Sequence, residues 1–314
     1  MVGAASAQVT IDGQIELGVV NTAAGTQLDA GNGGSQIRFS SKEDLGGGMS
    51  AMATMAMRFS PESGQWDGTA NNRPAFQGES TVGIAGAFGS VKIGRALPAL
   101  MVGSGATDPW GQRQQAHTGL LTTGYASDGD NTSGSGSGAG RTDAIHYSSP
   151  NVNGFSAMVS AGLKRSASTG TGTNGSNGGF TSYWVSYGNG PLAAGFGSEK
   201  NRTGDSVTAY LATYDLGMAK IGVGTSSVDA KATTGSKGQN TNYMLTVPFG
   251  AVTAALTMAS MKAEGTLAAT SKSGIGASYA LSKKTRVYIT QGATKTKATG
   301  ATAKGWDLGI THAF

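Results

Sequence analysis

Two arginines of this chain each stand between apolar residues, in the segments Ile37-Arg38-Phe39 and Met57-Arg58-Phe59. Successive side chains of a β-strand point to opposite faces, so each guanidinium group would lie on the face away from its apolar neighbours. A guanidinium group on a water-facing surface attracts anions and offers them several hydrogen-bond donors. Arg38 and Arg58 therefore predict a positively charged wall on the polar face of a sheet.

Residue types that support enzymatic chemistry are scarce. The chain has no cysteine, which excludes a thiol nucleophile, a cysteine zinc site and disulfides. The three histidines, His117, His146 and His312, lie far apart in the sequence, and no H-E-x-x-H or G-x-S-x-G pattern accompanies them. We therefore expect no catalytic residues, no metal site and no cofactor.

The overall composition is unusual for a soluble enzyme. Glycine makes up 52 of the 314 residues, about 17%, whereas its typical share is about 7%. Charged residues make up 13%, whereas their typical share is about 25%. The net charge of +5 is modest and the apolar residues are regularly spaced, which argues against a disordered chain. Basic residues are dispersed among acidic ones, so nucleic-acid binding is not expected. No apolar run reaches the roughly 18 residues of a membrane-spanning helix.

Alternation of apolar and polar residues is the main structural signal. The first alternating segment places Val9, Ile11, Ile15, Leu17 and Val19 on one face and Thr10, Asp12, Gln14 and Glu16 on the other. The last one places Trp306, Leu308, Ile310 and Phe314 opposite Asp307, Gly309, Thr311 and Ala313. At 204–215 and 284–292 the pattern is too weak to assign faces. This period of two predicts an all-β protein whose strands have two different faces.

The connections between these strands alternate between tight turns and longer polar loops. Turn-forming residues mark seven tight turns, at 44–48, 86–89, 151–154, 188–191, 215–217, 249–251 and 282–284. Eight longer connections lie near 21–34, 60–72, 98–140, 165–180, 199–204, 228–239, 262–272 and 293–303. Seven turns and eight loops predict sixteen antiparallel strands. An even number places both chain ends on the short-turn side, so the first and last strands can pair and close the sheet.

A closed barrel of this size is too wide for side chains to fill and holds water. The apolar face then points outward to lipid, which predicts a transmembrane β-barrel with short periplasmic turns and long outer loops. Aromatic residues near strand ends fit interfacial girdles: Phe39, Phe59, Tyr147, Tyr187, Trp306 and Phe314. A secreted, soluble β-rich adhesin is the alternative from another class, but it would bury Asp12, Glu16, Arg38 and Arg58 without evident partners.

The N-terminus has the small-x-small form of a signal-peptidase site, Ala5-Ser6-Ala7 before Gln8. We expect residues 1–7 to be the residual end of a signal peptide and residues 8–314 to form the barrel domain. An ordinary N-terminus of small residues is the alternative.

Five motifs, in order, resemble the general porins of Gram-negative outer membranes, from Gln8 to Phe314. They are Ser41-Lys42-Glu43-Asp44-Leu45-Gly46-Gly47-Gly48; Val82-Gly83-Ile84 with Phe88-Gly89 and Gly94-Arg95; Tyr147-Ser148-Ser149-Pro150-Asn151 with Gly154-Phe155; Tyr279-Ala280-Leu281-Ser282-Lys283-Lys284-Thr285; and His312-Ala313-Phe314. The resemblance implies a sixteen-stranded, homotrimeric barrel of the cell outer membrane whose third loop folds inward and narrows the channel. The third loop here is 98–140, after the fifth strand.

The resemblance also implies which residues line the constriction. Arg95 and Arg141 resemble its basic residues, Arg73 and Lys92 are further candidates, and the third loop offers Asp108 and, less clearly, Asp128 and Asp130. The chain departs from its relatives at Gln36, where they commonly carry arginine, at Arg38, where they carry glycine, and at Gly78, where they tend to carry arginine. An arginine at position 38 in place of one at position 36 keeps the positive charge on the same face of the strand, because residues two apart point the same way.

A cationic wall opposite an acidic loop gives a transverse field in a narrow opening. We therefore predict a non-enzymatic channel for passive diffusion of small hydrophilic solutes and ions, with a mild preference for anions and with outer-membrane lipid around it. A porin specific for a sugar or an organic anion is the nearer alternative, in which Trp184 would stack a sugar. An outer-membrane hydrolase would share the barrel, and hydrolysis assays would distinguish it. Subunits would meet around Gly13 and His312.

Overall fold

The computed structural model describes residues 8–29, 34–66, 75–111, 114–119, 141–162, 180–201, 204–230, 235–265 and 268–314. The expected remnant of a signal peptide, residues 1–7, lies outside these ranges. Within them, no helix has the length and hydropathy needed to cross a membrane.

Strands make up nearly all of the regular structure. They are β1 (Gln8–Thr22), β2 (Gly25–Asp29), β3 (Gln36–Gly46), β4 (Met49–Ser60), β5 (Gln65–Trp66), β6 (Glu79–Gly86), β7 (Gly89–Ala96), β8 (Thr142–Ser148), β9 (Phe155–Gly162), β10 (Thr181–Asn189), β11 (Leu192–Lys200), β12 (Ser206–Asp215), β13 (Lys220–Ala230), β14 (Ser236–Phe249), β15 (Val252–Glu264), β16 (Thr270–Ala280), β17 (Thr285–Thr296) and β18 (Thr302–Ala313). A short helix, α1 (Ala99–Gly103), follows β7.

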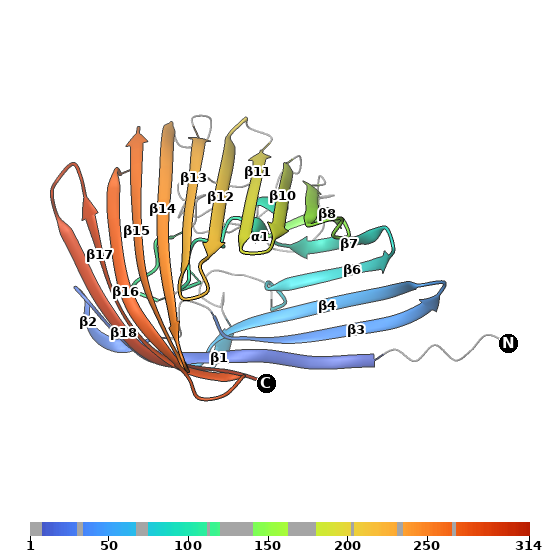
Figure 1. The fold of residues 1–314 in the computed structure, drawn as a ribbon. Helices are drawn as coiled ribbons and strands as arrows, with labels where there is room; N and C mark the ends of the chain where they lie inside the picture. The colour runs from blue at the N-terminus through green and yellow to red at the C-terminus, as the bar shows by residue number, and fades with distance from the viewer. Residues whose placement is uncertain are drawn as a thin grey trace.

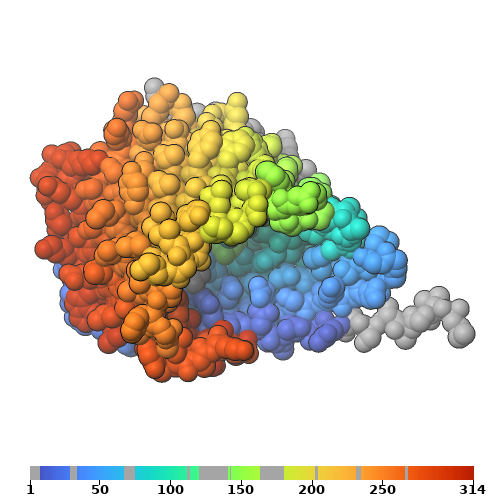
Figure 2. Space-filling model, in the orientation of Figure 1, coloured from blue at the N-terminus to red at the C-terminus, as the bar shows by residue number. Residues whose placement is uncertain are grey.

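Sixteen of these strands form one closed antiparallel barrel, as the sequence predicts. The other two, β2 and β5, are short strands within the first two long connections. Each barrel strand pairs with its neighbours in chain order, and β18 pairs with β1 from Gln14↔Ala313 to Asn21↔Trp306. The C-terminus therefore lies beside β1 (Figure 1), and the red C-terminal strands meet the blue N-terminal ones in the space-filling view (Figure 2).

The seven tight turns that the sequence predicts all join neighbouring strands at one end of the barrel. Glycines take the left-handed backbone that such turns require, as Gly154 (φ 89°) and Gly217 (φ 82°) do. The loop ends are less well predicted. The backbone pairing of β13 with β14 continues to Ala230↔Ser236, inside the expected loop at 228–239, and Asp229 and Lys237 form an exposed ion pair across the two strands there.

The two faces of the strands are as the alternation predicts. Val9 and Ile11 are 65% and 59% exposed on the outside, whereas Glu16 and Asp307 are 0% and 3% exposed inside. The segment 204–215 gave no pattern because β12 is apolar on both faces. Its Tyr210 points outward, while Val207 is fully buried within the barrel by the third loop.

Candidate pore constriction

The third loop enters the barrel directly after β7 and begins with α1. The backbone N–H of Ala99 donates to Ser160 Oγ on β9 at 3.0 Å, and that of Leu100 donates to Ser182 Oγ on β10 at 2.9 Å. The first N–H groups of a helix have no partner within the helix, so these inward serines satisfy two of them. Leu100 is fully buried. The helix is thus fixed to the inner wall.

An apolar cluster inside the barrel holds α1 in place. It is formed by Ala99, Leu100, Trp184, Val207, Ala209, Leu211, Val228 and Ala230, with Met158 packed against it. Trp184 points inward, as expected, but only 3% of its surface is exposed. Gly103 and Gly195 leave room for its indole ring, because a side chain at either position would overlap it. The alternative in which Trp184 stacks a sugar is therefore not favoured, because α1 covers the indole ring.

A second segment of the loop, 114–119, crosses the opposite part of the inner wall. Its hydrogen bonds reach five strands in turn: Gln114 Nε2 to Glu16 Oε1 on β1 (2.8 Å), Gln115 N to Asp307 Oδ2 on β18 (2.7 Å), Ala116 N to Thr290 Oγ1 on β17 (3.0 Å), Thr257 Oγ1 on β15 to Ala116 O (2.6 Å), and Asn242 Nδ2 on β14 to Gly119 O (3.1 Å). We call these five wall residues the loop clamp: Glu16, Asn242, Thr257, Thr290 and Asp307.

Glycines make the close approach of this segment possible. A side chain at Gly292 on β17 would overlap the backbone oxygen of Gln115, and one at Gly274 on β16 would overlap that of Ala116. The loop backbone therefore lies directly on the wall, with no side chains between them.

Asp108 organises the loop from within. Its side chain is 8% exposed, and Oδ1 accepts the backbone N–H of Trp110 at 3.0 Å. Burial raises the pKa of the Asp108 carboxyl to about 6, although backbone N–H groups, including that of Gly119, and the charge of Lys272 oppose the rise. Burial also lowers the pKa of the nearby His117 to about 4, with a contribution from Lys272. The carboxyl group of Asp108 thus joins two parts of the loop, and this position does not favour the expected role as an acidic wall of the channel.

The other side of the barrel carries the basic residues. Arg38 on β3 donates through Nε to Asp12 Oδ1 on β1 at 2.9 Å, and its Nη2 lies 2.7 Å from the same oxygen. Lys92 Nζ on β7 lies 2.7 Å from Glu79 Oε1 on β6. Arg58 on β4 is the register partner of Gln36 and faces inward by alternation. The described loop segments follow β9–β18 and β1, so these three cations lie where those segments leave the wall uncovered.

The remaining candidates are less directly placed. Arg95 lies within β7, and its Nε donates to the backbone oxygen of Gln77 at 3.0 Å. Alternation puts it on the side of Ile93, which is 52% exposed outside the barrel, so its place does not favour a constriction role. Arg141 is half-buried directly before β8. Arg73, Asp128 and Asp130 lie outside the described residues, and the roles of all five stay predictions.

Sequence reasoning missed the partners of the charged residues and the loop clamp. Glu79 and the clamp residues Thr257, Thr290 and Asn242 stand at inward, polar positions of alternating strands, which is a readable signal. Their partners depend on strand register and on the path of the loop, and neither is contained in a local pattern.

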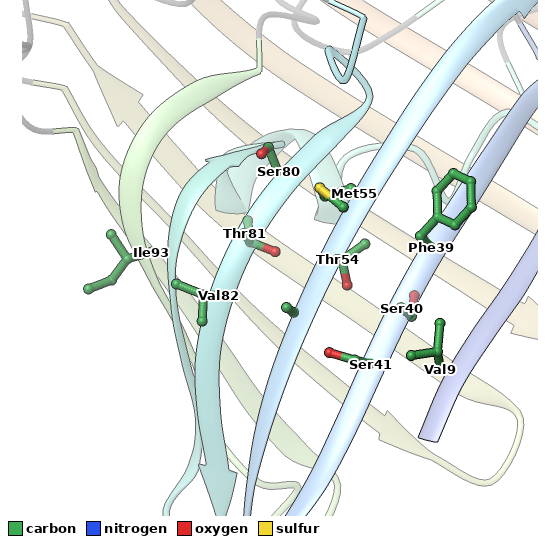
Figure 3. A pocket seen from close by; sticks show the side chains of 11 residues that line it. Val9, Phe39, Ser40, Ser41, Thr54, Met55, Ser80, Thr81, Val82 and Ile93 are labelled. Atoms are coloured by element: carbon green, nitrogen blue, oxygen red, sulfur yellow. The ribbon is translucent and has the colours of Figure 1, made fainter. Parts of the chain in front are cut away.

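An apolar groove lies on the outer surface, separate from the channel interior (Figure 3). It crosses β1, β3, β4, β6 and β7, and the lining residues include Val9, Met55, Val82 and Ile93. These four side chains are between 46% and 65% exposed. The groove therefore belongs to the outward face of the barrel.

Comparison with known proteins agrees with this architecture. Residues 2–299 match the family model described as Gram-negative porin. The outer membrane porin protein 32 of Delftia acidovorans is 28% identical over 275 residues, which are 80% of this chain and 73% of that protein. The major outer membrane protein P.IB of Neisseria meningitidis serogroup B is 30% identical over 205 residues, 59% of this chain and 54% of that protein.

Solved porin structures share the fold at low sequence identity. The anion-selective porin from Comamonas acidovorans superposes with a TM-score of 0.81 at 22% identity, covering 98% of this chain and 100% of that one. The trimer form of OmpT from Vibrio cholerae gives a TM-score of 0.72 at 13% identity, covering 98% and 100%. Since the family model spans nearly the whole sequence and the barrel has the same architecture, this chain belongs to the Gram-negative porins, the channel-forming proteins of the outer membrane.

Proposed function

We propose that this porin passes small hydrophilic solutes and ions by passive diffusion, with a mild preference for anions. The observation that carries the proposal is the third loop fixed against one side of the inner wall, while Arg38, Arg58 and Lys92 lie on the other side. A narrow, water-filled opening bordered by cations raises the local concentration of anions. The solved porin from Comamonas acidovorans is described as anion-selective, which agrees with this proposal.

The preference should be mild because carboxylates lie beside two of these cations. Asp12 contacts Arg38 and Glu79 contacts Lys92, both with a closest N–O distance of 2.7 Å. Each pair contributes less net field than a lone cation. We therefore expect each of these residues to make a small contribution to the preference for anions, and we expect that no single residue accounts for all of it.

Reversal potentials across a salt gradient test the selectivity of the refolded protein in a planar bilayer. We expect an anion-leaning potential that shrinks at high salt, because charges are screened over about 3 Å at 1 M and about 10 Å at 0.1 M. A cation-leaning potential would refute the proposal. In the same preparation, assays of ester and peptide hydrolysis should show no turnover.

A channel specific for an organic anion is the second candidate function. Trp184 is covered by α1, so the sugar-binding alternative loses the aromatic residue on which it depended. Several cations on one wall still suit a carboxylate or phosphate solute. A solute that blocks the ion current at micromolar concentration would favour this specific channel over general diffusion.

We further propose a homotrimer, as the solved trimer form of OmpT supports. The first and last strands remain the proposed contact, but Gly13 also has a role within the chain. A side-chain carbon at position 13 would overlap the backbone oxygen of Gln36 and lie 2.8 Å from the ring of Phe314, so the glycine allows both the neighbouring strand and this ring to approach closely. Crosslinking of the folded protein in membranes should give trimers, and a product containing only monomers would contradict the proposal.

A further inference from the structure

We propose that Asn189, at the short-turn end of β10, is a site of spontaneous deamidation in the folded protein, whereas Asn153, in the neighbouring turn, is protected. The sequence contains five Asn-Gly dipeptides, and two of them, Asn153-Gly154 and Asn189-Gly190, lie within the described residues. Both asparagines are exposed in tight turns at the same end of the barrel. The proposal concerns a covalent modification of a turn and does not depend on what the channel transports.

The reaction joins the backbone nitrogen of the following residue to the side-chain carbon Cγ of asparagine. A bond forms between this nitrogen and Cγ, the bond from Cγ to Nδ2 breaks, and Nδ2 leaves as ammonia with the proton lost from the backbone nitrogen. The succinimide ring then takes up one water molecule and opens at either carbonyl, which gives aspartate or isoaspartate. Glycine has no side chain to hinder the attack. The rate therefore depends on whether the glycine N–H is free and whether the turn can open.

The turn after β10 leaves its glycine N–H free. Within the described part of the chain, the N–H of Gly190 has no hydrogen-bond acceptor. Asn189↔Leu192 is the last register pair of β10 with β11, and Pro191 has no N–H that could hold the turn. The side-chain bond of Asn189, from Nδ2 to Tyr187 Oη at 3.0 Å, is exposed to water. Since the ends of ladders open at low cost, the carboxamide can reach the Gly190 nitrogen.

The turn between β9 and its preceding segment holds the same dipeptide in place. Asn151 Oδ1 accepts the N–H of Gly154 at 3.0 Å, which occupies the nitrogen that would attack. The backbone oxygen of Gly154 accepts the N–H of Gly188 at 2.9 Å, and Val152 and Phe155 exchange backbone hydrogen bonds of 2.8 and 3.0 Å across the turn. Ring closure here would require several of these bonds to break together. The identical dipeptide should therefore react more slowly at this position.

Deamidation changes both the charge and the backbone of the turn after β10. An aspartate carboxyl has an ordinary pKa of about 3.9 and is ionised at neutral pH, so each modified chain loses one unit from its net charge of +5. The isoaspartate product also routes the backbone through the side chain, which adds one atom to the two-residue turn between Asn189 and Leu192. Chains that have been folded for different times should thus differ in charge at this end of the barrel.

Incubation of the refolded, full-length protein in detergent micelles at mildly basic pH tests the proposal. The incubation uses heavy-oxygen water, and the modified residues are located by fragmentation of the peptides in a mass spectrometer. We expect Asn189 to react at least about fivefold faster than Asn153, which is the factor that corresponds to one hydrogen bond of ordinary strength. In urea-unfolded protein the two rates should be similar, because glycine follows both residues. No reaction at Asn189, or the same ratio of rates in folded and unfolded protein, would overturn the proposal.

Matched variants test the protecting hydrogen bond directly. Asn151 is exposed, and Asn151→Ala removes the acceptor of the Gly154 N–H, so the rate at Asn153 should rise about fivefold while the rate at Asn189 stays unchanged. Asn151→Asp keeps an acceptor oxygen and should keep the protection. A rise in both variants, or in neither, would show that this bond does not protect the turn. In Asn189→Gln the longer side chain closes a ring poorly, so a mass gain that persists in this segment would belong to another residue and overturn the assignment.

Discussion

Replacing Asp307 by alanine should loosen the third loop inside the barrel. Oδ2 of Asp307 accepts the backbone N–H of Gln115 at 2.7 Å, and Oδ1 accepts the hydroxyl of Thr290 at 2.5 Å. The side chain is 3% exposed. The truncation therefore removes the acceptor of the partly buried N–H of Gln115. It also removes the acceptor of the Thr290 hydroxyl, which in turn accepts the N–H of Ala116.

The size of the effect follows from the kind of bond. A hydrogen bond to a charged group contributes about 1.5–3 kcal/mol, so a loss of about 2 kcal/mol is reasonable. Since about 1.4 kcal/mol corresponds to a factor of ten, the population with segment 114–119 released from the wall should rise about 30-fold. Released loops change the width of the opening from moment to moment. The expected result is increased noise of the open channel and a wider spread of single-channel conductance in planar bilayers.

A control on the same strand separates loop release from general damage. Thr311 on β18 is also inward and 7% exposed, but its hydroxyl makes no hydrogen bond among the described residues. Thr311→Ala should therefore keep the quiet current of the wild type. If Asp307→Ala folds into the barrel and conducts with unchanged noise and mean conductance, the loop is not held by the clamp and the reasoning is wrong.

Three further perturbations test other parts of the structure. Gly292→Val places a side chain where the backbone of the loop lies, so it should shift the mean single-channel conductance. Gly309→Val is the matched control on the inner wall away from the loop, and it should mainly lower thermal stability. Arg38→Gln leaves Asp12 without its cation, so the reversal potential should move toward cation selectivity. Arg38→Lys keeps the charge and should retain most of the wild-type reversal potential. An unchanged reversal potential in Arg38→Gln would show that Arg38 does not line the constriction. Burial raises the pKa of Asp108 from 3.8 to about 6, so the folded state holds a proton that the unfolded state has lost, and stability falls as pH rises from about 4 to about 6. The loss of unfolding free energy is at most about 3 kcal/mol. In the Asp108→Asn variant, the urea midpoint of unfolding should not fall over this pH range. If the midpoint of the wild type changes with pH as it does in the variant, the assignment to Asp108 is wrong.

The barrel itself could be predicted because its signals are local. Alternation assigns a face to each residue of β1 and β18, and glycine-rich turns mark where strands end. The predicted loop at 228–239 ended β13 too early and began β14 too late, because the backbone ladder continues to Ala230↔Ser236 through residues whose polar composition resembles that of a loop.

The interior of the barrel could be predicted only in part. Alternation correctly placed Trp184 and Asp307 inside, but it could not show that one is covered by α1 and the other holds Gln115. These contacts join residues 98 and 192 positions apart, for Glu16 with Gln114 and for Asp307 with Gln115. Such pairings depend on the path of the third loop through the lumen, which no strand pattern encodes.

The position of the third loop has a consequence for assembly. Gln114 binds β1 and Gln115 binds β18, so two adjacent residues of the loop hold the two sides of the seam where the chain ends meet. The seam joins the residues that are farthest apart in the sequence, and closing it carries the largest loop-closure entropy of any strand pairing. The loop segment inside the channel therefore also stabilises the pairing of β1 with β18. We expect a shortened third loop to give a wider channel and a barrel that closes more slowly during folding.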